Sequence, residues 1–138
     1  MENLIFLTFA TFLAIISIVD IKSKMIYDKV LIPMAAVGIF FDAAGWLVPI
    51  DEGIFCAASG FAMMYVVFKM ARGGLGGGDV KFSAVLGLWL GTKIFSAIFI
   101  ASVIAAVFGI FFYAKTRDAK FEIPFAPFLA IGALLTQI

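Results

Sequence analysis

The sequence predicts an all-α polytopic membrane protein, a bundle of about six transmembrane helices with both termini outside the cell. Two observations favour this class: 64% of the 138 residues are hydrophobic and 14% are charged, and the mean hydropathy is +1.17. A soluble domain is nearer to half apolar with about a quarter charged, and one this small could not bury so many apolar side chains. The lipid bilayer is therefore the natural solvent for this chain.

Six apolar runs mark the expected spans. They are Leu4–Val19, Val30–Phe41 continuing past Asp42 to Ile50, Gly53–Phe68, Phe82–Thr92, Ile94–Ala114 and Ile123–Ile138. Several are shorter than the roughly 20 residues that a straight span needs. We therefore expect either that flanking polar residues lie near the membrane interface, or that the fourth segment enters the membrane in a water-filled cavity. The first apolar run follows the acidic Glu2, and the basic residues come after the run. A cleaved signal peptide has its basic residues before the apolar run, so this order does not fit one. We find no internal repeat and expect a single domain, residues 1–138.

The positions of the basic residues predict the orientation of the spans. Nine of the ten lie in alternate connections: Lys22, Lys24 and Lys29, then Lys69, Arg72 and Lys81, then Lys115, Arg117 and Lys120. Only Lys93 lies on the other side, where Asp51 and Glu52 also lie. Because basic residues concentrate in cytoplasmic loops, we expect three connections in the cytoplasm and both termini outside.

Two residue types are nearly absent, and this excludes several kinds of site. The chain has no histidine and one cysteine, Cys56. One cysteine cannot form an internal disulfide or a cysteine-based zinc site. Without histidine there is no Ser-His or Cys-His nucleophile pair and no HExxH metalloprotease motif.

A glycine-rich stretch, "ARGGLGGGDVKF" at residues 71–82, separates two apolar runs and places Asp79 at the start of the fourth. In the predicted topology, Asp20 at the end of the first run and Asp28 at the start of the second lie at the same face. Ionisable residues at the edge of the hydrocarbon region are costly and are functional candidates. Two carboxylates at one depth indicate an aspartyl-protease pair that shares a proton. The glycines would allow positive φ angles and close backbone approach beside it.

Other interpretations of these acidic residues remain open at this point. The glycines can be a flexible loop with Asp79 as a helix N-cap, and Asp20 can be an ordinary interfacial residue. Asp28 fits a solvated loop residue, and Asp42 fits a structural contact facing the bundle. The stretch matches neither nucleotide-binding template, GxxxxGK[ST] or GxGxxG in register.

Three features of the sequence resemble the type IV prepilin peptidases, which are GxGD intramembrane aspartyl proteases. Residues 76–81, GGGDVK, fit the family motif GxGDxK; Asp20, followed by a basic loop, matches its other aspartate; and "IPFAPFLAIGA" from Ile123 to Ala133 is similar to "IPFGPFLxxG". The resemblance implies that Asp20 and Asp79 are the catalytic pair, and that Gly76, Gly78 and Lys81 support the motif. It also implies that no metal or cofactor takes part.

The resemblance further implies an activity and its partners. Such enzymes remove the short leader of prepilins and pseudopilins, single-span proteins, by cutting after a glycine at the cytoplasmic face of the cell membrane. We therefore expect this substrate and the lipid bilayer as partners, and no nucleic acid. The chain lacks the CxxC-bearing insertion of larger members that also N-methylate, so it resembles the short peptidase-only form.

One departure and one alternative accompany the resemblance. Residues 26–28 read Ile-Tyr-Asp where the family usually has Ile-Pro-Asn, and Tyr27-Asp28 is similar to the YD pair of presenilin-like proteases. We prefer Asp20 as the partner of Asp79 because Asp28 sits among loop charges. The alternative is a non-enzymatic membrane protein, such as a small transporter subunit or a pilus or secretion assembly factor, although the repeated halves typical of transporters are absent.

Overall fold

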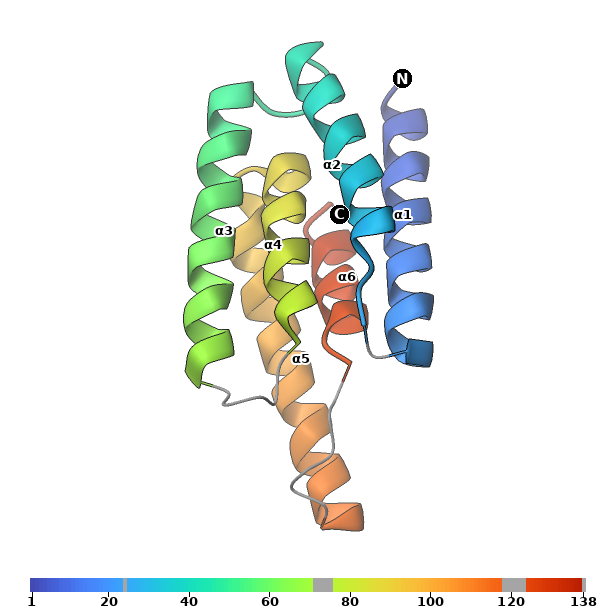
Figure 1. The fold of residues 1–138 in the computed structure, drawn as a ribbon, viewed down its shortest axis with the longest axis vertical. Coiled ribbons are helices and arrows are strands. Elements are labelled where there is room, and N and C mark those ends of the chain that lie inside the picture. The colour runs from blue at the N-terminus through green and yellow to red at the C-terminus, as the bar shows by residue number, and fades with distance from the viewer. Residues whose placement is uncertain (24, 71–75, 118–123, 138) are drawn as a thin grey trace.

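The computed structural model describes residues 1–23, 25–70, 76–117 and 124–137. Within these ranges the chain forms six α-helices: α1 (Glu2–Ser23), α2 (Asp28–Ala43), α3 (Ile50–Met70), α4 (Gly77–Leu90), α5 (Lys93–Thr116) and α6 (Ala126–Leu135). Figure 1 shows that helices consecutive in the sequence run in opposite directions along the bundle. The predicted all-helical class is confirmed.

The six helices fall into three long and three short ones. The long helices α1, α3 and α5 are apolar enough and long enough to cross a membrane. The short helices α2, α4 and α6 have 16, 14 and 10 residues. At 1.5 Å per residue, α4 is about 21 Å long and α6 about 15 Å, which is less than the roughly 30 Å of a hydrocarbon core.

Two of the expected runs differ from the helices that form. The second run was expected to continue to Ile50, but α2 ends at Ala43 and the chain turns at Gly45, whose φ is +73°. Glycine tolerates this left-handed conformation, which other residues avoid. The sixth run was expected from Ile123 to Ile138, but α6 covers only Ala126–Leu135, and both expected end residues lie outside the described ranges.

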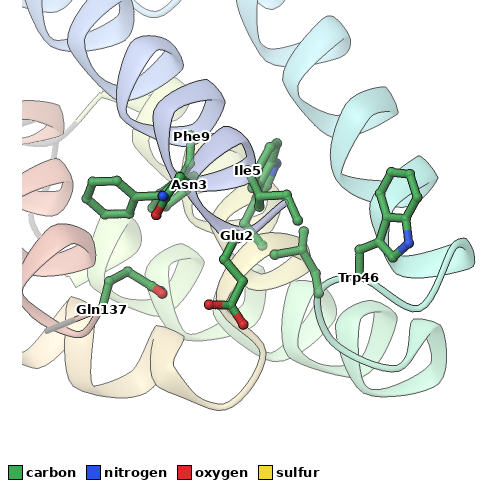
Figure 2. Close-up of a pocket in the computed structure, with 9 residues that line it drawn as sticks. Glu2, Asn3, Ile5, Phe9, Trp46 and Gln137 are labelled. Atoms are coloured by element: carbon green, nitrogen blue, oxygen red, sulfur yellow. The ribbon is translucent and has the colours of Figure 1, made fainter.

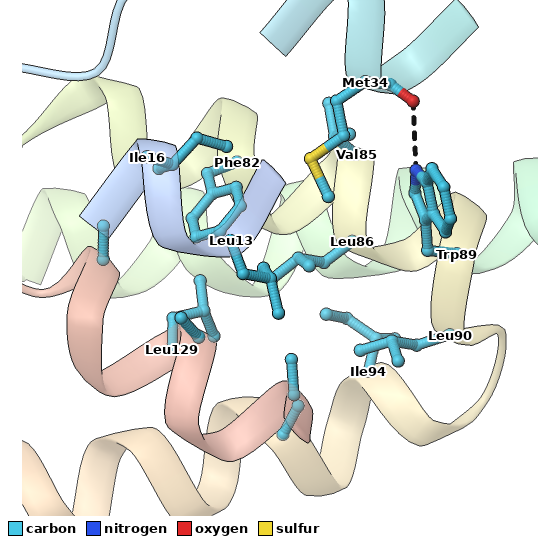
Figure 3. Close-up of a cluster of buried hydrophobic side chains, with 14 of the residues drawn as sticks. Leu13, Ile16, Met34, Phe82, Val85, Leu86, Trp89, Leu90, Ile94 and Leu129 are labelled. Carbon is cyan, nitrogen blue, oxygen red and sulfur yellow. Dashed lines mark hydrogen bonds between the residues drawn. The ribbon is translucent and has the colours of Figure 1, made fainter. Parts of the chain in front are cut away.

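Helix α4 lies in the middle of the bundle and packs against α2, α3, α5 and α6. Ten of its 14 residues are buried. In the apolar stretches of the three long helices, by contrast, only 22–28% of the residues are buried inside the protein. Figure 3 shows Phe82, Leu86 and Trp89 of α4 among side chains from α1, α2 and α6. A helix buried on most sides is a core helix, and the exposed apolar surface of the long helices suits lipid.

Small residues allow the helix backbones to approach closely. A Cβ added at Gly87 of α4 would lie 2.6 Å from backbone atoms of Cys56 and Ala57 in α3. The Ser83 hydroxyl lies 3.2 Å from the carbonyl oxygen of Gly60 in α3 and 2.7 Å from that of Val80 in its own helix, so its one hydrogen is shared between the two acceptors. Glycine, alanine and serine are typical of such membrane-helix contacts. The contacts with α3 hold α4 at one height in the bundle.

The charges separate between the two ends of the bundle. One end, called the basic end below, is where α1, α3 and α5 finish and α2, α4 and α6 start (Figure 1). Of the described basic residues, Lys22, Lys29, Lys69, Lys81, Lys115 and Arg117 lie toward the basic end. Lys93 lies at the opposite end with Asp51 and Glu52. Lys24, Arg72 and Lys120 lie outside the described residues.

We predict that Gly87→Ala destabilises the bundle by about 1–3 kcal/mol, the usual range for overpacking. The added Cβ meets the α3 backbone, which cannot move away as a side-chain tip would. Denaturant unfolding in detergent measures the change.

Gly77→Ala is the matched control, because a Cβ at Gly77 meets nothing within 4 Å. Alanine is favoured over glycine within helices by about 1 kcal/mol, so the control should be neutral or more stable. Equal stability of the two variants would contradict the close approach of α3 and α4.

Candidate active site

The structure brings Asp20 and Asp79 together at the basic end. Asp20 lies in the last turn of α1 and Asp79 in the first turn of α4. Their side chains are buried, with exposed fractions of 4% and 5%, and their carboxyl groups are close enough to interact electrostatically. Among the described residues there is no group of three or more His, Cys, Asp or Glu side chains that could hold a metal ion. The candidate site is built on this pair of buried carboxyl groups.

The start of α4 positions Asp79. Gly76 precedes the helix in an extended conformation, and its carbonyl accepts a 3.2 Å hydrogen bond from the backbone N–H of Asp79. The Oδ1 atom of Asp79 is buried and has no hydrogen-bond partner among the described residues. An unsatisfied buried polar atom costs about 1–3 kcal/mol. Such an atom calls for an explanation, because native structures contain few of them, and a role in catalysis is one that would account for it.

The start of α6 lies against Asp20. The backbone N–H of Ala126, the first residue of α6, donates a 3.3 Å hydrogen bond to Oδ2 of Asp20. The first N–H groups of a helix have no partner within the helix, so a carboxyl group can accept one. This contact was not predicted from the sequence. The sequence feature that could have indicated this contact is Pro127 in the first turn of α6, because proline there marks the start of a helix at the same end as Asp20.

The glycines of the motif matter because they lack a side chain, and not because they adopt unusual φ angles. Gly76, Gly77 and Gly78 all lack a positive φ, so the expected use of positive φ is wrong for these three residues; Gly74 lies outside the described ranges. A Cβ at Gly78 would lie 2.9 Å from the Cβ of Ile26, in the connection between α1 and α2. A Cβ at Gly76 would lie 3.6 Å from Oδ2 of Asp79, an ordinary contact distance. Gly78 therefore has the stricter size limit.

Lys81 and Asp28 form an ion pair beside this site. The Nζ atom of Lys81 lies 3.3 Å from Oδ1 of Asp28, and both side chains are more than half exposed. This ion pair was not predicted from the sequence. Asp28 is thus exposed and bound to a cation, whereas Asp20 is buried beside Asp79, and this supports the preference for Asp20 as the partner.

Asp42 is buried at the opposite end and belongs to a different contact. Its Oδ1 accepts a 3.4 Å hydrogen bond from the backbone N–H of Val48, which fixes the turn after α2. Its Oδ2 has no partner among the described residues and faces Gly53, where an added Cβ would lie 2.7 Å away. Asp42 therefore matches the expected structural contact facing the bundle.

The type IV leader peptidase family matches residues 7–110 of this chain, a range that includes both aspartates and the glycine motif. This chain belongs to that family. The family predicted from the GxGD motif and Asp20 is thus confirmed. The segment from Ile123 to Ala133 lies beyond the matched residues.

Several relatives are similar over most of this chain, and each is named prepilin leader peptidase/N-methyltransferase. The protein of Bacillus subtilis is 36% identical over 135 residues, which cover 94% of this chain and 53% of the relative. The protein of Xanthomonas campestris pv. campestris is 36% identical over 88% of this chain and 45% of its own length. The protein of Pseudomonas aeruginosa is 29% identical over 88% and 44%. The chain spans about half the length of these relatives, and no solved structure matches it.

We predict that Gly78→Ala and Ile26→Gly are coupled. The alanine Cβ at residue 78 would overlap the Cβ of Ile26, so Gly78→Ala alone should destabilise the protein, and Ile26→Gly, which removes that Cβ, should relieve part of the loss. Neighbouring residues typically couple by about 0.5–3 kcal/mol. Unfolding free energies of the wild type, the single variants and the double variant give the coupling.

The same cycle with Gly77→Ala in place of Gly78→Ala is the control and should be additive, because Gly77 faces open space. Additive values for Gly78 and Ile26 would mean that the α1–α2 connection does not lie against the motif.

Proposed function

We propose that this protein is a membrane aspartyl endopeptidase that removes the short leader peptide of type IV prepilin-like proteins, cutting after a glycine at the cytoplasmic face. One observation carries the proposal: Asp20 and Asp79, on helices distant in sequence, are buried side by side at one end of the bundle. Membership of the type IV leader peptidase family and the names of the relatives support it. They favour a peptidase over a non-enzymatic transporter subunit or assembly factor.

We propose that the protein lies in the cell membrane with the basic end in the cytoplasm and both termini outside. The long apolar helices α1, α3 and α5 would cross the bilayer, with α2, α4 and α6 inserted among them. The concentration of lysine and arginine at the basic end supports this orientation, because positive residues favour the cytoplasmic side. Asp20 and Asp79 would then meet a leader that remains in the cytoplasm while the apolar helix of its substrate stays in the membrane.

In the proposed reaction, Asp20 and Asp79 act as one acid–base unit. Two adjacent carboxyl groups cannot both ionise cheaply, so one keeps a proton. The ionised carboxylate takes a proton from water as the water oxygen attacks the carbonyl carbon of the glycine, and the protonated carboxyl group gives its proton to the carbonyl oxygen. Collapse of the tetrahedral intermediate breaks the C–N bond, and the leaving amine takes up a proton from the pair.

Two further observations indicate that one carboxyl group of the pair is held in place and that the other is free to bind. The Ala126 N–H fixes the orientation of the Asp20 carboxyl group, and orientation is a major source of catalytic rate. The Oδ1 atom of Asp79, which has no hydrogen-bond partner within the described part of the chain, is available to bind water or the substrate. The start of α6 thereby contributes a positioning group to the proposed site.

We predict that Asp20→Asn and Asp79→Asn each reduce cleavage by about 10²–10⁴-fold or more, because each removes half of the acid–base unit. The assay is loss of the leader from a co-expressed prepilin-like protein, seen as a gel shift. Asp51→Asn, an exposed acid at the opposite end, is the matched control and should retain activity.

Asp28→Asn distinguishes the two candidate pairs and should have a milder effect than Asp20→Asn, since Asp28 is exposed and paired with Lys81. Membrane fractionation confirms insertion of each variant. If Asp28→Asn abolished cleavage while Asp20→Asn remained active, the pair would be Asp28 and Asp79.

We predict that Lys81→Arg retains nearly full cleavage and that Lys81→Ala loses at most about fivefold. An exposed ion pair contributes about 0–1 kcal/mol, and arginine keeps the charge that pairs with Asp28. Steady-state cleavage of a prepilin-like peptide in detergent measures both variants. A hundredfold loss in Lys81→Arg would instead place Lys81 in contact with the carboxyl pair or the substrate.

A further inference from the structure

A cavity of about 330 Å³ lies at the end of the bundle opposite Asp20 and Asp79. Its walls come from the first turns of α1, the connection between α2 and α3, the end of α4 and the residue Gln137 after α6 (Figure 2). The proposed peptidase reaction uses none of these residues. The cavity is therefore a candidate site separate from the carboxyl pair.

Aromatic rings form one side of the cavity, and other contacts hold them in place. Trp89 stacks on Phe9 with ring centroids 5.2 Å apart, and its indole N–H donates a 3.0 Å hydrogen bond to the carbonyl of Met34. Trp46 packs edge-on against Phe40 at 6.0 Å. The indole N–H of Trp89 is thus occupied, and both tryptophans are among the residues that line the cavity. Tryptophan faces attract cations more strongly than other aromatic rings do.

Polar groups form the other side. Glu2 is the only residue with a formal charge among those described as lining the cavity, and Asn3 and Gln137 each contribute an amide. In the view of Figure 2 the Glu2 carboxylate is drawn nearer to Gln137 than to Trp46. A carboxylate and two amide carbonyls offer three acceptors, and an ammonium group has three N–H donors. The charge and the donor count both fit a primary ammonium ion.

The apolar part of the lining continues onto the outer surface of α1. Ile5, Phe6 and Leu47 complete the cavity wall. Phe6 is also 48% exposed, and Leu4 and Leu7 are exposed on other sides of the same helix. A ligand that places its ammonium group beside Glu2 could therefore extend hydrocarbon along the exposed apolar surface of α1. A ligand with both an ammonium group and a hydrocarbon chain is an amphiphile and not a small soluble amine.

We propose that this cavity binds the ammonium head group of phosphatidylethanolamine from the adjoining leaflet, with an acyl chain against α1. The head group donates hydrogen bonds to Glu2, Asn3 and Gln137, and the tryptophan faces cover its charge. The phosphate stays at the rim, because the described lining provides no cationic side chain for it. The binding does not depend on the peptidase reaction.

The two tryptophans of the chain both line the cavity, so their fluorescence reports its occupant directly. The experiment uses the full chain in phosphatidylcholine vesicles that contain increasing fractions of brominated phosphatidylethanolamine or brominated phosphatidylcholine. We expect the ethanolamine lipid to quench at a several-fold lower mole fraction, because a choline head group cannot donate hydrogen bonds. Glu2→Gln should reduce this preference by about three- to fivefold, as loss of one exposed ion pair allows.

Asp51→Asn is the matched control, since Asp51 is an acid at the same end that does not line the cavity, and it should keep the preference. Asp79→Asn should also keep it, which separates lipid binding from the proposed peptidase function. Equal quenching by the two lipids would overturn the proposal, as would an undiminished preference in Glu2→Gln or a lost preference in Asp51→Asn. A change in emission caused by soluble ethanolamine in pure phosphatidylcholine vesicles would assign the cavity to a free amine and would also overturn it.

Discussion

The close backbone contact between α3 and α4 is the constraint on which the rest of the bundle depends. Lipid tails are as apolar as leucine, so the hydrophobic effect gives little drive for helices to associate within a bilayer, and packing and hydrogen bonds must provide it. Gly87 lets α4 approach the backbone of Cys56 and Ala57, and the Ser83 hydroxyl bonds the Gly60 carbonyl. These contacts hold a helix too short to span the membrane at a fixed height in the centre of the bundle.

That height determines where Asp79 lies. Three of the helix ends at the basic end contribute to the proposed site. The end of α1 carries Asp20, the start of α4 carries Asp79, and the start of α6 donates a backbone N–H to Asp20. Burying two neighbouring carboxyl groups is costly, and one oxygen of Asp79 has no partner among the described residues. Asp28, in contrast, stays exposed and paired with Lys81. The proposed catalytic pair is thus the costly arrangement, which the packing of α4 must stabilise.

The sequence predicted the parts of this arrangement that depend on position along the chain. Apolar run lengths predicted six helices, and alternating direction placed Asp20 and Asp79 at one end. The central position of α4 was not predictable, because hydropathy measures apolar content but does not tell which faces meet. The contact of Gly87 with Cys56 and the pairing of Lys81 with Asp28 join residues far apart in sequence. The end of α2 was misjudged because the residues after Gly45 are apolar although they form a turn.

Thiol cross-linking in membranes tests most directly whether Asp20 and Asp79 are neighbours. The Asp20→Cys/Asp79→Cys double variant is treated with a short thiol-bridging reagent, and mass spectrometry identifies the linked peptides. Each single variant reports any link to Cys56, which is buried against Gly87. The account predicts a link between positions 20 and 79 and none in Asp42→Cys/Asp79→Cys, whose residues lie at opposite ends. Absence of the first link, or an equal yield of both, would contradict it.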